Sequence, residues 1–267
     1  MSRSTISTFK LFETFPDAES ARLYFESKLW PDGMKGGLNE LALFAGAGGG
    51  ILGGKLLGWR TVCAVEINSF CCRRLMQRQN EGHLPPFPIW DDVRTFDGKP
   101  WRRVIDVVSG GFPCQPFSTA THGCPTAENF WPEMRRIISE VQPPFVFAEN
   151  VSDKAIRKAA TDCQELGYRT ETIRLSAKDV GADHIRKRYW LLAYSDMCDE
   201  LCCCLYAKTP KLPNFRAGIW ETEPHKSGMV DGVAYRLDRL HSIGNGQVPL
   251  VAATAWCILL RRMFSLG

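Results

Sequence analysis

Residues 109–118 read SGGFPCQPFS and follow an apolar run, Val104–Val108, that has the length and β-branched content of a buried strand. Two glycines and two prolines cannot continue such a strand, so we expect it to end there. Pro113 and Pro116 restrict the backbone on either side of Cys114. The sequence therefore predicts a cysteine on a rigid loop at the carboxyl end of a strand, where open α/β sheets carry their chemistry. The plainer interpretation is a tight turn that contains a cysteine by chance.

Short apolar strands alternate with helical stretches on both sides of this loop. Such alternation predicts an α/β fold with a mainly parallel sheet and helices on both faces. We expect strands over residues 41–44, 61–65, 104–108, 145–148, 168–173 and 191–194, a further element that ends at 91–93, and helices over 131–141 and 250–264, with others that end near Leu57 and Leu166.

A glycine-rich turn, Ala45–Gly50, joins the first expected strand to a helix. Glycines there let the backbone approach a ligand closely, which is the general form of a nucleotide-binding loop. A purely structural turn is nearly as good an interpretation of the glycines alone. Glu66 ends the next strand about twenty residues further on, where a carboxylate can accept hydrogen bonds from both ribose hydroxyls. The alternative for Glu66 is an ordinary surface carboxylate.

Polar side chains also mark the ends of two later strands. Glu149 follows the apolar run 145–148, and we infer that it converges with Cys114 if the two strands are neighbours. Arg186 and Arg188 precede another apolar strand, and strand alternation directs both to the same face. A solvated basic strand end explains these arginines equally well at this stage.

The composition sets limits but does not identify a partner. At 267 residues, the chain can bury a full core as one domain or as one large and one small domain. The eleven cysteines are clustered irregularly, so reduced thiols are the better interpretation. We find no membrane-spanning run and no secretory signal, and we expect a cytoplasmic protein. A formal charge of +4 is compatible with a polyanionic partner but does not argue for one.

Residues 1–37 differ from the rest of the chain. They predict a short helix, Ala18–Leu29, ended by the turn Trp30–Gly33, and resemble the opening of insertion-sequence transposases that carry a zinc ribbon. That family continues with a Cys-x-x-Cys pair, whereas residues 34–37 read MKGG here. We therefore predict no metal site, and we interpret this extension as an appendage without a catalytic role.

Five motifs in a shared order carry a resemblance to the DNA (cytosine-5) methyltransferase family. The chain resembles this family over about 38–194 and 231–257, including a FWPE sequence at 130–133 that is similar to the LWPE variant of phage and bacterial members. The five motifs are FAGAGG at 44–49, GFPCQPFS at 111–118, ENV at 149–151, RKR at 186–188 and GNGQVP at 244–249.

The resemblance implies a reaction in which Cys114 attacks carbon 6 of a flipped-out cytosine in DNA. A thiolate is both nucleophilic and able to leave again. Glu149 would hold or deliver a proton at N3, a task that favours a raised carboxyl pKa. Arg188 would contact the flipped base, with Arg186 supporting the site or a phosphate. The methyl donor implied by the resemblance is S-adenosylmethionine.

The family pattern also implies a Rossmann-like methyltransferase fold and a set of cofactor-binding residues. Ile67 stands where many members carry a larger apolar residue against the adenine, and His184 replaces the commonest glutamine. Glu66 would bind the ribose hydroxyls and Asp92 the adenine amino group. The residues expected at the cofactor are Phe44, Ala45, Gly46, Ala47, Gly48, Gly49, Glu66, Ile67, Asp92, Val93, Pro113 and Asn245.

We divide the chain into an extension (1–37), a catalytic and cofactor-binding domain (38–194), a short target-recognition region (195–238) and a returning turn and helix (239–267). Many family members are far longer in the recognition region, so base-specific contacts have few residues to come from. We expect a monomer that acts on double-stranded DNA. The alternatives are a catalytically impaired DNA-binding remnant, because fold alone does not secure function, and a tRNA cytosine-5 methyltransferase of the same fold.

Overall fold

The computed structural model describes residues 37–113, 129–182, 184–195 and 246–265. Apart from Gly37, these residues belong to one compact unit, Leu38–Gly267. The expected helix Ala18–Leu29 and the expected recognition region, 195–238, lie outside the described residues apart from Ser195. The domain boundaries therefore stay predictions.

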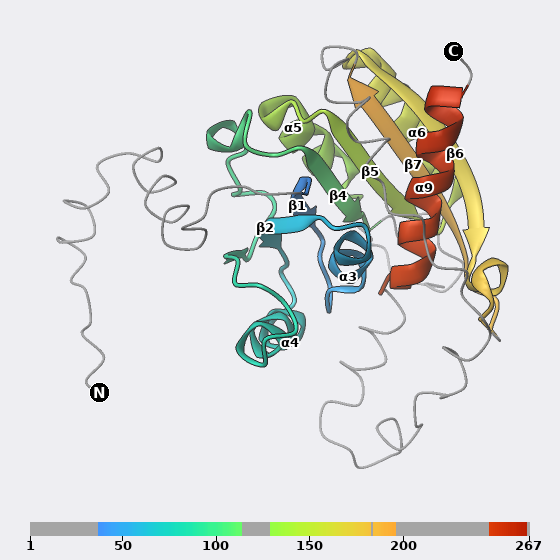
Figure 1. Ribbon diagram of the computed structural model, residues 1–267. Coiled ribbons are helices and arrows are strands. Elements are labelled where there is room, and N and C mark those ends of the chain that lie inside the picture. Colours follow the sequence, from blue (N-terminus) through green and yellow to red (C-terminus); the bar gives the residue numbers. More distant parts are fainter. Residues whose placement is uncertain (1–36, 114–128, 183, 196–245, 266–267) are drawn as a thin grey trace, which may run out of the picture. The chain divides into compact units, whose positions relative to one another are not determined.

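The described residues form a seven-stranded sheet with the order β3-β2-β1-β4-β5-β7-β6 (Figure 1). The strands β1 to β5 pair in parallel, and β7 runs antiparallel to both of its neighbours. The mainly parallel α/β sheet predicted from the sequence is confirmed. The strands are β1 (Asn39–Leu43), β2 (Arg60–Val65), β3 (Ile89–Trp90), β4 (Val107–Gly111), β5 (Phe145–Asn150), β6 (Tyr168–Ser176) and β7 (Lys187–Ser195).

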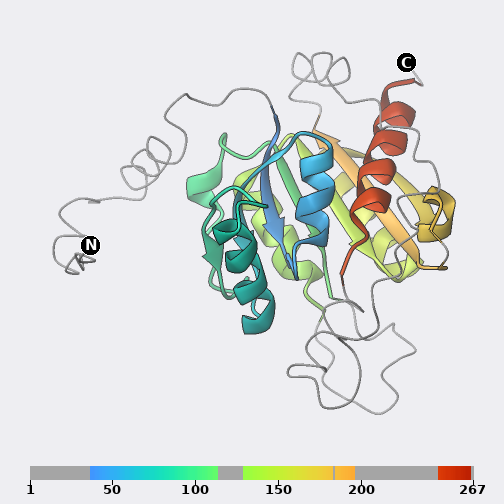
Figure 2. The same ribbon diagram turned by 60° about the horizontal axis from the view of Figure 1, so that its bottom comes forward.

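Helices cover both faces of the sheet. Figures 1 and 2 show α3 and α9 side by side on one face, with α5 and α6 on the opposite face. No helix in the described ranges is long and apolar enough to cross a membrane. The helices are α3 (Gly49–Leu56), α4 (Ser69–Asn80), α5 (Trp131–Val141), α6 (Asp153–Glu165) and α9 (Pro249–Ser265), with 3-10 turns η1 (Lys99–Trp101) and η3 (Ala177–Val180).

The bounds of α5 agree with the sequence prediction because the helix carries clear signals at both ends. Pro132 stands in the first turn, where its missing N–H removes no helical hydrogen bond. Gln142 ends the helix in the left-handed conformation, with φ 52°. The buried side chains between these ends recur at helical spacing and are Trp131, Met134, Ile137, Ile138 and Val141.

An aromatic cluster joins α9 to the sheet. The Trp256 ring lies with its centroid 5.3 Å from that of Phe145 and 5.5 Å from that of Phe147, both on β5. It also lies 4.6 Å from the ring of Trp59, in the loop after α3. Burying an aromatic ring contributes about 1.5–3 kcal/mol, so this cluster holds the middle of α9 against β5.

The position of β4 corrects one prediction. We expected a strand over 104–108 that ends at the glycines, but Val104 lies in a turn, with its N–H donating to the carbonyl of Trp101. The strand instead includes Gly110, which pairs with Leu43 of β1. A Cβ on Gly110 would lie 2.8 Å from the Leu43 carbonyl oxygen. Glycine therefore extends this strand, because only a residue without a side chain lets the two backbones approach so closely.

Candidate active site

The candidate site lies at the carboxyl edge of the parallel strands. Strands β1, β2, β4 and β5 all end at this edge, and β7 begins there because it runs antiparallel to β5. The register places Gly111 opposite Glu149, and Asn150 opposite Tyr189. Residues that are far apart in the sequence therefore meet at one edge.

Glu149 is a buried carboxylate, with 5% of the residue exposed, and it faces one cation at close range. Nε of Arg188 lies 2.8 Å from its Oε1. This contact is an ion pair rather than an aligned hydrogen bond, since Oε1 has no hydrogen-bond donor among the described residues. The Gln247 side chain donates from Nε2 to Oε2 over 3.5 Å, a long hydrogen bond.

The surroundings of Glu149 shift its pKa to a range that suits proton transfer near neutral pH. Burial raises its pKa to about 7, while Arg188, Arg186 and Gln247 each act in the opposite direction. Burial dominates because removing a carboxylate from water penalises its charged form more than the cations compensate for. A carboxyl group with a pKa near the working pH can both hold and release a proton.

Both arginines are held by specific contacts, so the interpretation as a solvated basic strand end is wrong for them. The Arg188 side chain is 17% exposed and pairs with Glu149. Arg186 donates from Nη2 to the Gly246 carbonyl oxygen over 2.6 Å. Strand β7 begins at Lys187, earlier than the predicted residue 191, because the 187–190 segment continues the ladder with β6.

The glycine-rich turn adopts the conformations for which glycine is suited. Gly46 and Gly48 have φ of 54° and 92°, in the left-handed region. Phe44 shares this region with φ 52°, which costs a non-glycine residue about 1 kcal/mol or more. Gly48 is the N-cap of α3 and has no side chain, so no N-cap side chain accepts from the amides of the first turn, Gly49 onward. In the same turn, the N–H of Ala45 donates to the Val65 carbonyl oxygen. The neighbouring Ala47 is exposed.

Glu66 is buried, with 9% exposed, so it is not an ordinary surface carboxylate. Its Oε2 accepts the N–H of Gly46 over 2.6 Å, and its Oε1 accepts the N–H of Asn68 over 2.7 Å. The carboxylate thus ties the glycine-rich turn to the end of β2. Each oxygen keeps a second lone pair, so Glu66 can still accept hydrogen bonds from a diol.

Three of the residues expected at the cofactor, two of them at its adenine, differ in how accessible they are. Ile67 is 65% exposed and offers an open apolar surface, whereas Val93 is only 6% exposed and packs into the core. Asp92 is engaged: Arg94 donates from Nη2 to Oδ2 over 2.8 Å and from Nε to Oδ1 over 3.0 Å. An adenine amino group would have to share or displace this pair.

The loop that leads to Cys114 is anchored up to the last residue described before it. Asn150 donates from Nδ2 to the Phe112 carbonyl oxygen over 2.8 Å, and the Phe112 ring lies 5.0 Å from that of Trp131. The Pro113 carbonyl oxygen accepts the N–H of Phe130 over 3.2 Å. Cys114 itself and Asn245 lie outside the described residues, so their predicted roles stay predictions.

Sequence reasoning did not assign Gln247 or Asn150 a role, although both belong to the quoted motifs. Gln247 lies 98 residues from the Glu149 that it contacts, and no local spacing reveals such a pairing. For Asn150, its place beside Glu149 at a strand end was the available signal. Within the described ranges, no group of three or more His, Cys, Asp or Glu side chains is arranged to hold a metal ion.

Comparison with known proteins gives a consistent result. Residues 38–221 match the family model described as C-5 cytosine-specific DNA methylase. The sequence is 34% identical over 175 residues to Type II methyltransferase M.Eco47II of Escherichia coli, covering 63% of this chain and 39% of that protein. It is 32% identical over 163 residues to Type II methyltransferase M.NgoMIV of Neisseria gonorrhoeae, covering 58% and 51%. The chain thus spans about half or less of the length of these relatives.

Among solved structures, the fold is similar to that of a candidate DNA modification methyltransferase encoded within an E. coli prophage. The TM-score is 0.50 at 27% sequence identity, and the match covers 61% of this chain and 48% of the other. The similarity supports the α/β methyltransferase fold expected from the sequence.

Proposed function

The chain belongs to the C-5 cytosine-specific DNA methylase family, and from this membership we propose that it transfers a methyl group from S-adenosylmethionine to carbon 5 of a cytosine flipped out of duplex DNA. The observation that carries the proposal is Glu149, a buried carboxyl that faces Arg188 at 2.8 Å and has a pKa of about 7. It stands opposite Gly111, three residues before the predicted nucleophile, Cys114.

The residues at the sheet edge fit the proposed cofactor. The uncapped first turn of α3 suits a carboxylate, because helix N-termini attract negative charge. The free lone pairs of Glu66 suit ribose hydroxyls, and the exposed Ile67 suits the flat face of an adenine. When bound, S-adenosylmethionine supplies an electrophilic methyl group. A small cavity under α3 has room for about 10 Å³, enough for one water molecule at most, and is therefore not the cofactor site.

Cys114 performs the first covalent step. Its thiolate adds to carbon 6 of cytosine, and the displaced electron pair moves through the ring toward N3, where a proton held by Glu149 neutralises it. Carbon 5 then carries the electron density needed to accept the methyl group. Loss of the carbon-5 proton to solvent, expulsion of the Cys114 thiolate and return of the N3 proton to Glu149 restore the neutral aromatic ring. The cysteine suits both ends of this sequence because it attacks and leaves readily.

Arg188 and Arg186 have different tasks in this proposal. Arg188 pairs with Glu149 through Nε and donates from Nη1 to the Lys187 carbonyl oxygen over 2.8 Å, so its third nitrogen, Nη2, is the donor proposed for the base. Arg186 holds the Gly246 carbonyl oxygen and so secures the returning turn beside the site. We keep both assignments as proposals, together with the predicted set of cofactor-binding residues.

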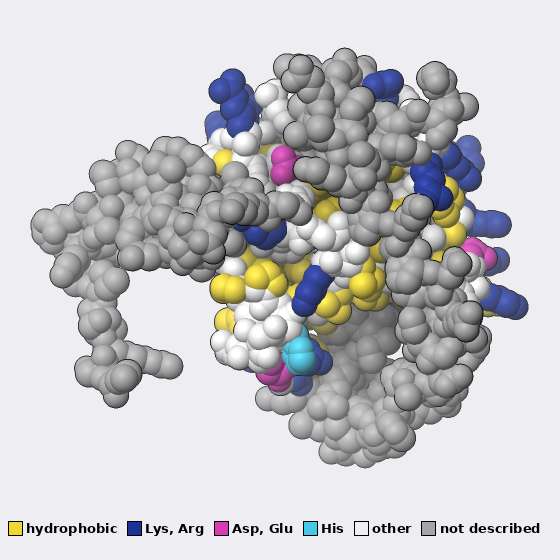
Figure 3. Space-filling view, in the orientation of Figure 1, with side chains coloured by type: hydrophobic (Ala, Val, Ile, Leu, Met, Phe, Trp, Pro, Cys, Tyr) yellow, Lys and Arg dark blue, Asp and Glu magenta, His cyan; other side chains and the backbone are white. Residues whose placement is uncertain are grey.

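The proposed partner is double-stranded DNA, bound by a monomer. Carbon 6 of cytosine is inaccessible inside a duplex, so the base must leave the stack at a cost of roughly a few kcal/mol. On the face shown in Figure 3, Lys and Arg side chains are spread over several separate places. The site and the family, rather than a basic surface, therefore support DNA as the partner. By analogy with the Type II relatives, we propose modification of a specific DNA sequence.

A duplex that contains 5-fluorocytosine tests the proposed reaction. Fluorine replaces the proton that must leave carbon 5, so we expect a covalent protein–DNA complex that forms with S-adenosylmethionine and disappears in Cys114→Ser. Glu149→Gln should still bind S-adenosylhomocysteine but methylate cytosine at least about a hundredfold more slowly. Cofactor binding without an adduct or methylation on any duplex overturns the proposal. Methylation of tRNA but not of duplex DNA replaces the proposed substrate with RNA.

A further inference from the structure

We propose that Gln247 is a positioning residue for Glu149: its side-chain amide is held in a slot formed by two glycines and donates to the carboxylate oxygen that Arg188 does not pair with. This inference rests on the proposed function, and it adds a residue from the C-terminal turn to the proton-transfer site. Arg188 faces Oε1 at 2.8 Å, and the Gln247 amide faces Oε2 at 3.5 Å. The two contacts together define the plane of the carboxyl group.

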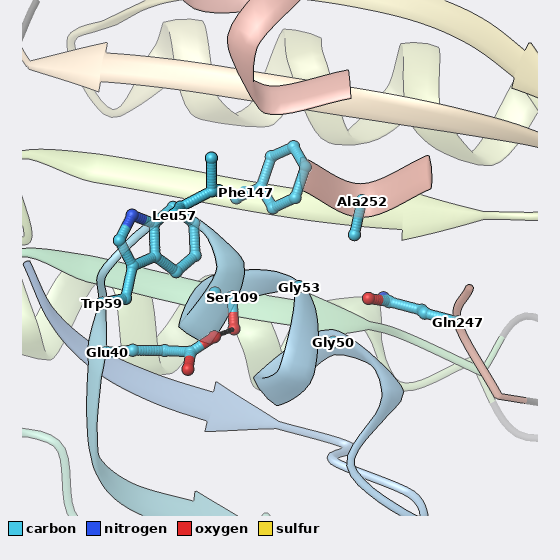
Figure 4. Close-up of a pocket in the computed structure, with 10 residues that line it drawn as sticks. Glu40, Gly50, Gly53, Leu57, Trp59, Ser109, Phe147, Gln247 and Ala252 are labelled. Atoms are coloured by element: carbon cyan, nitrogen blue, oxygen red, sulfur yellow. Dashed lines mark hydrogen bonds between the residues drawn. The ribbon is translucent and has the colours of Figure 1, made fainter. Parts of the chain in front are cut away.

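The slot exists because residues 50 and 111 are both glycine. A Cβ on Gly50 of α3 would lie 2.6 Å from Oε1 of Gln247. A Cβ on Gly111 of β4 would lie 2.9 Å from Nε2 of Gln247 and 2.7 Å from Oε2 of Glu149. Figure 4 shows the Gln247 side chain directed inward from the turn before α9, toward Gly50. Any side chain at either glycine would require the amide to move.

The backbone of the turn is anchored independently of this amide. The Gly246 carbonyl oxygen accepts from Arg186, and the Ala252 N–H donates to the Val248 carbonyl oxygen. A Cβ on Gly49 would collide with the Gln247 carbonyl oxygen, so the backbone of the turn packs directly on the start of α3. Replacing only the side chain of Gln247 should therefore leave the turn in place.

The charges around Glu149 decide the direction of the effect. Arg188 faces it from β7 and Arg186 from the residue before that strand, Gln247 faces it from the turn before α9, and the start of α3 presents glycines. Glu40 of β1 and Ser109 of β4 line the cavity that Gln247 also borders (Figure 4). A donor to a carboxylate stabilises its charged form, so loss of the Gln247 amide should raise the pKa of Glu149.

The test compares Gln247→Met, which keeps the length of the side chain without a donor, with Gln247→Glu, which adds a second carboxylate. For Gln247→Met we expect the alkaline limb of kcat/KM for methyl transfer to move up by roughly half a pH unit to one unit. The kcat at the pH optimum should fall about tenfold, because the carboxyl group is less well oriented. Gln247→Glu should move the limb further in the same direction.

The matched control is Gln77→Met. Gln77 of α4 also donates from Nε2 to a glutamate, Glu81, over 2.6 Å, but this pair lies exposed and away from the site. Its loss should leave the pH profile of methyl transfer unchanged. An unshifted profile in Gln247→Met, or an equal shift in Gln77→Met, overturns the proposal.

A second readout does not depend on methyl transfer. The pH dependence of the free energy of unfolding reports the pKa of Glu149 in the folded protein. As a single substitution, Gln247→Met should shift the pH dependence of the free energy of unfolding to higher pH. In a protein that also carries Glu149→Gln, it should cause no such shift. If no DNA or RNA is methylated, the proposed function fails. The comparison of the single and double variants then still shows whether Gln247 acts on Glu149. A shift that persists in the double variant contradicts the inference.

Discussion

Gly111 lies opposite Glu149 in the parallel register of β4 and β5, so close that a Cβ on Gly111 would lie 2.7 Å from Oε2 of the carboxylate. Gly111→Ala should therefore push Glu149 away from Arg188. We expect a loss of about 1–3 kcal/mol in the free energy of unfolding from overpacking, and a fall in kcat of roughly a hundredfold from misplacement of the carboxyl group.

Gly110→Ala is the control for this prediction. Its Cβ would meet the Leu43 carbonyl oxygen at 2.8 Å, so it strains the pairing of β1 with β4 without reaching Glu149. Urea unfolding and methyl-transfer rates measured on both variants separate the two effects. Equal losses of kcat in the two variants, at equal stability, would show that the contact between Gly111 and Glu149 has no special role.

The raised pKa of Glu149 predicts how stability depends on pH. Because folding raises this pKa from 4.5 to about 7, the folded protein binds the proton more tightly than the unfolded chain does. The resulting stabilisation is complete below pH 4.5 and is lost as the pH rises through about 7. Between these limits the parent protein should lose about 3 kcal/mol relative to Glu149→Gln, since one pKa unit corresponds to about 1.4 kcal/mol.

Unfolding of both proteins in urea at several pH values measures this difference, and other titrating groups cancel in the comparison. Methyl transfer should follow the same group, with kcat/KM falling above about pH 7 as Glu149 loses its proton. A stability difference that stays constant from pH 4.5 to 8 would mean that Glu149 titrates normally in the folded protein.

Much of the fold could be predicted from the sequence because strand ends and helix ends carry local signals. The bounds of α5 follow from Pro132, the helical spacing of apolar residues and the turn at Gln142. The position of Glu66 follows from a strand–turn–helix–strand unit with a carboxylate at the second strand end, whereas its hydrogen bond from Gly46 is seen only in the structure. Such signals depend on neighbours in the chain.

The contacts that complete the site could not be predicted in this way. Gln247 reaches Glu149 because Trp256 packs α9 against β5 and the turn before α9 packs on Gly49 at the start of α3. The burial of Glu40 could not be predicted from the sequence either, since a glutamate next to an apolar run usually points to solvent. The Gln247 contact and the burial of Glu40 both depend on how elements that are distant in the sequence pack together. The sequence of one protein does not reveal this packing.

Glu40 provides a second pH-dependent prediction. It is 1% exposed, and its two carboxylate oxygens accept from the hydroxyls of Ser109 and Thr61, each over 2.6 Å. Burial raises its pKa, and the two hydroxyls only partly oppose this shift. The stabilisation from the protonated form is therefore present at low pH and is lost as the pH rises through the raised pKa.

Glu40→Gln cannot ionise, so its stability relative to the parent protein should increase as the pH rises. Urea unfolding at pH 5 and pH 8 tests this, with Thr61→Val as a companion: loss of one hydroxyl donor should raise the pKa of Glu40 further. Identical pH dependence in Glu40→Gln and the parent protein would contradict the prediction. So would a Thr61→Val variant that shifts the dependence to lower pH.

The pair formed by Arg94 and Asp92 predicts an effect on cofactor affinity. Because Arg94 occupies both oxygens of the carboxylate proposed to bind the adenine amino group, Arg94→Ala should tighten the binding of S-adenosylhomocysteine. The gain should not exceed about fivefold, since exposed ion pairs are weak, and it should shrink at high salt. Arg78→Ala, which removes a similar exposed pair with Glu81 on α4, should leave the affinity unchanged. Calorimetric titration with S-adenosylhomocysteine measures the affinity of the parent protein and of both variants. Weaker binding by Arg94→Ala would instead mean that Arg94 holds Asp92 in the orientation that the adenine requires.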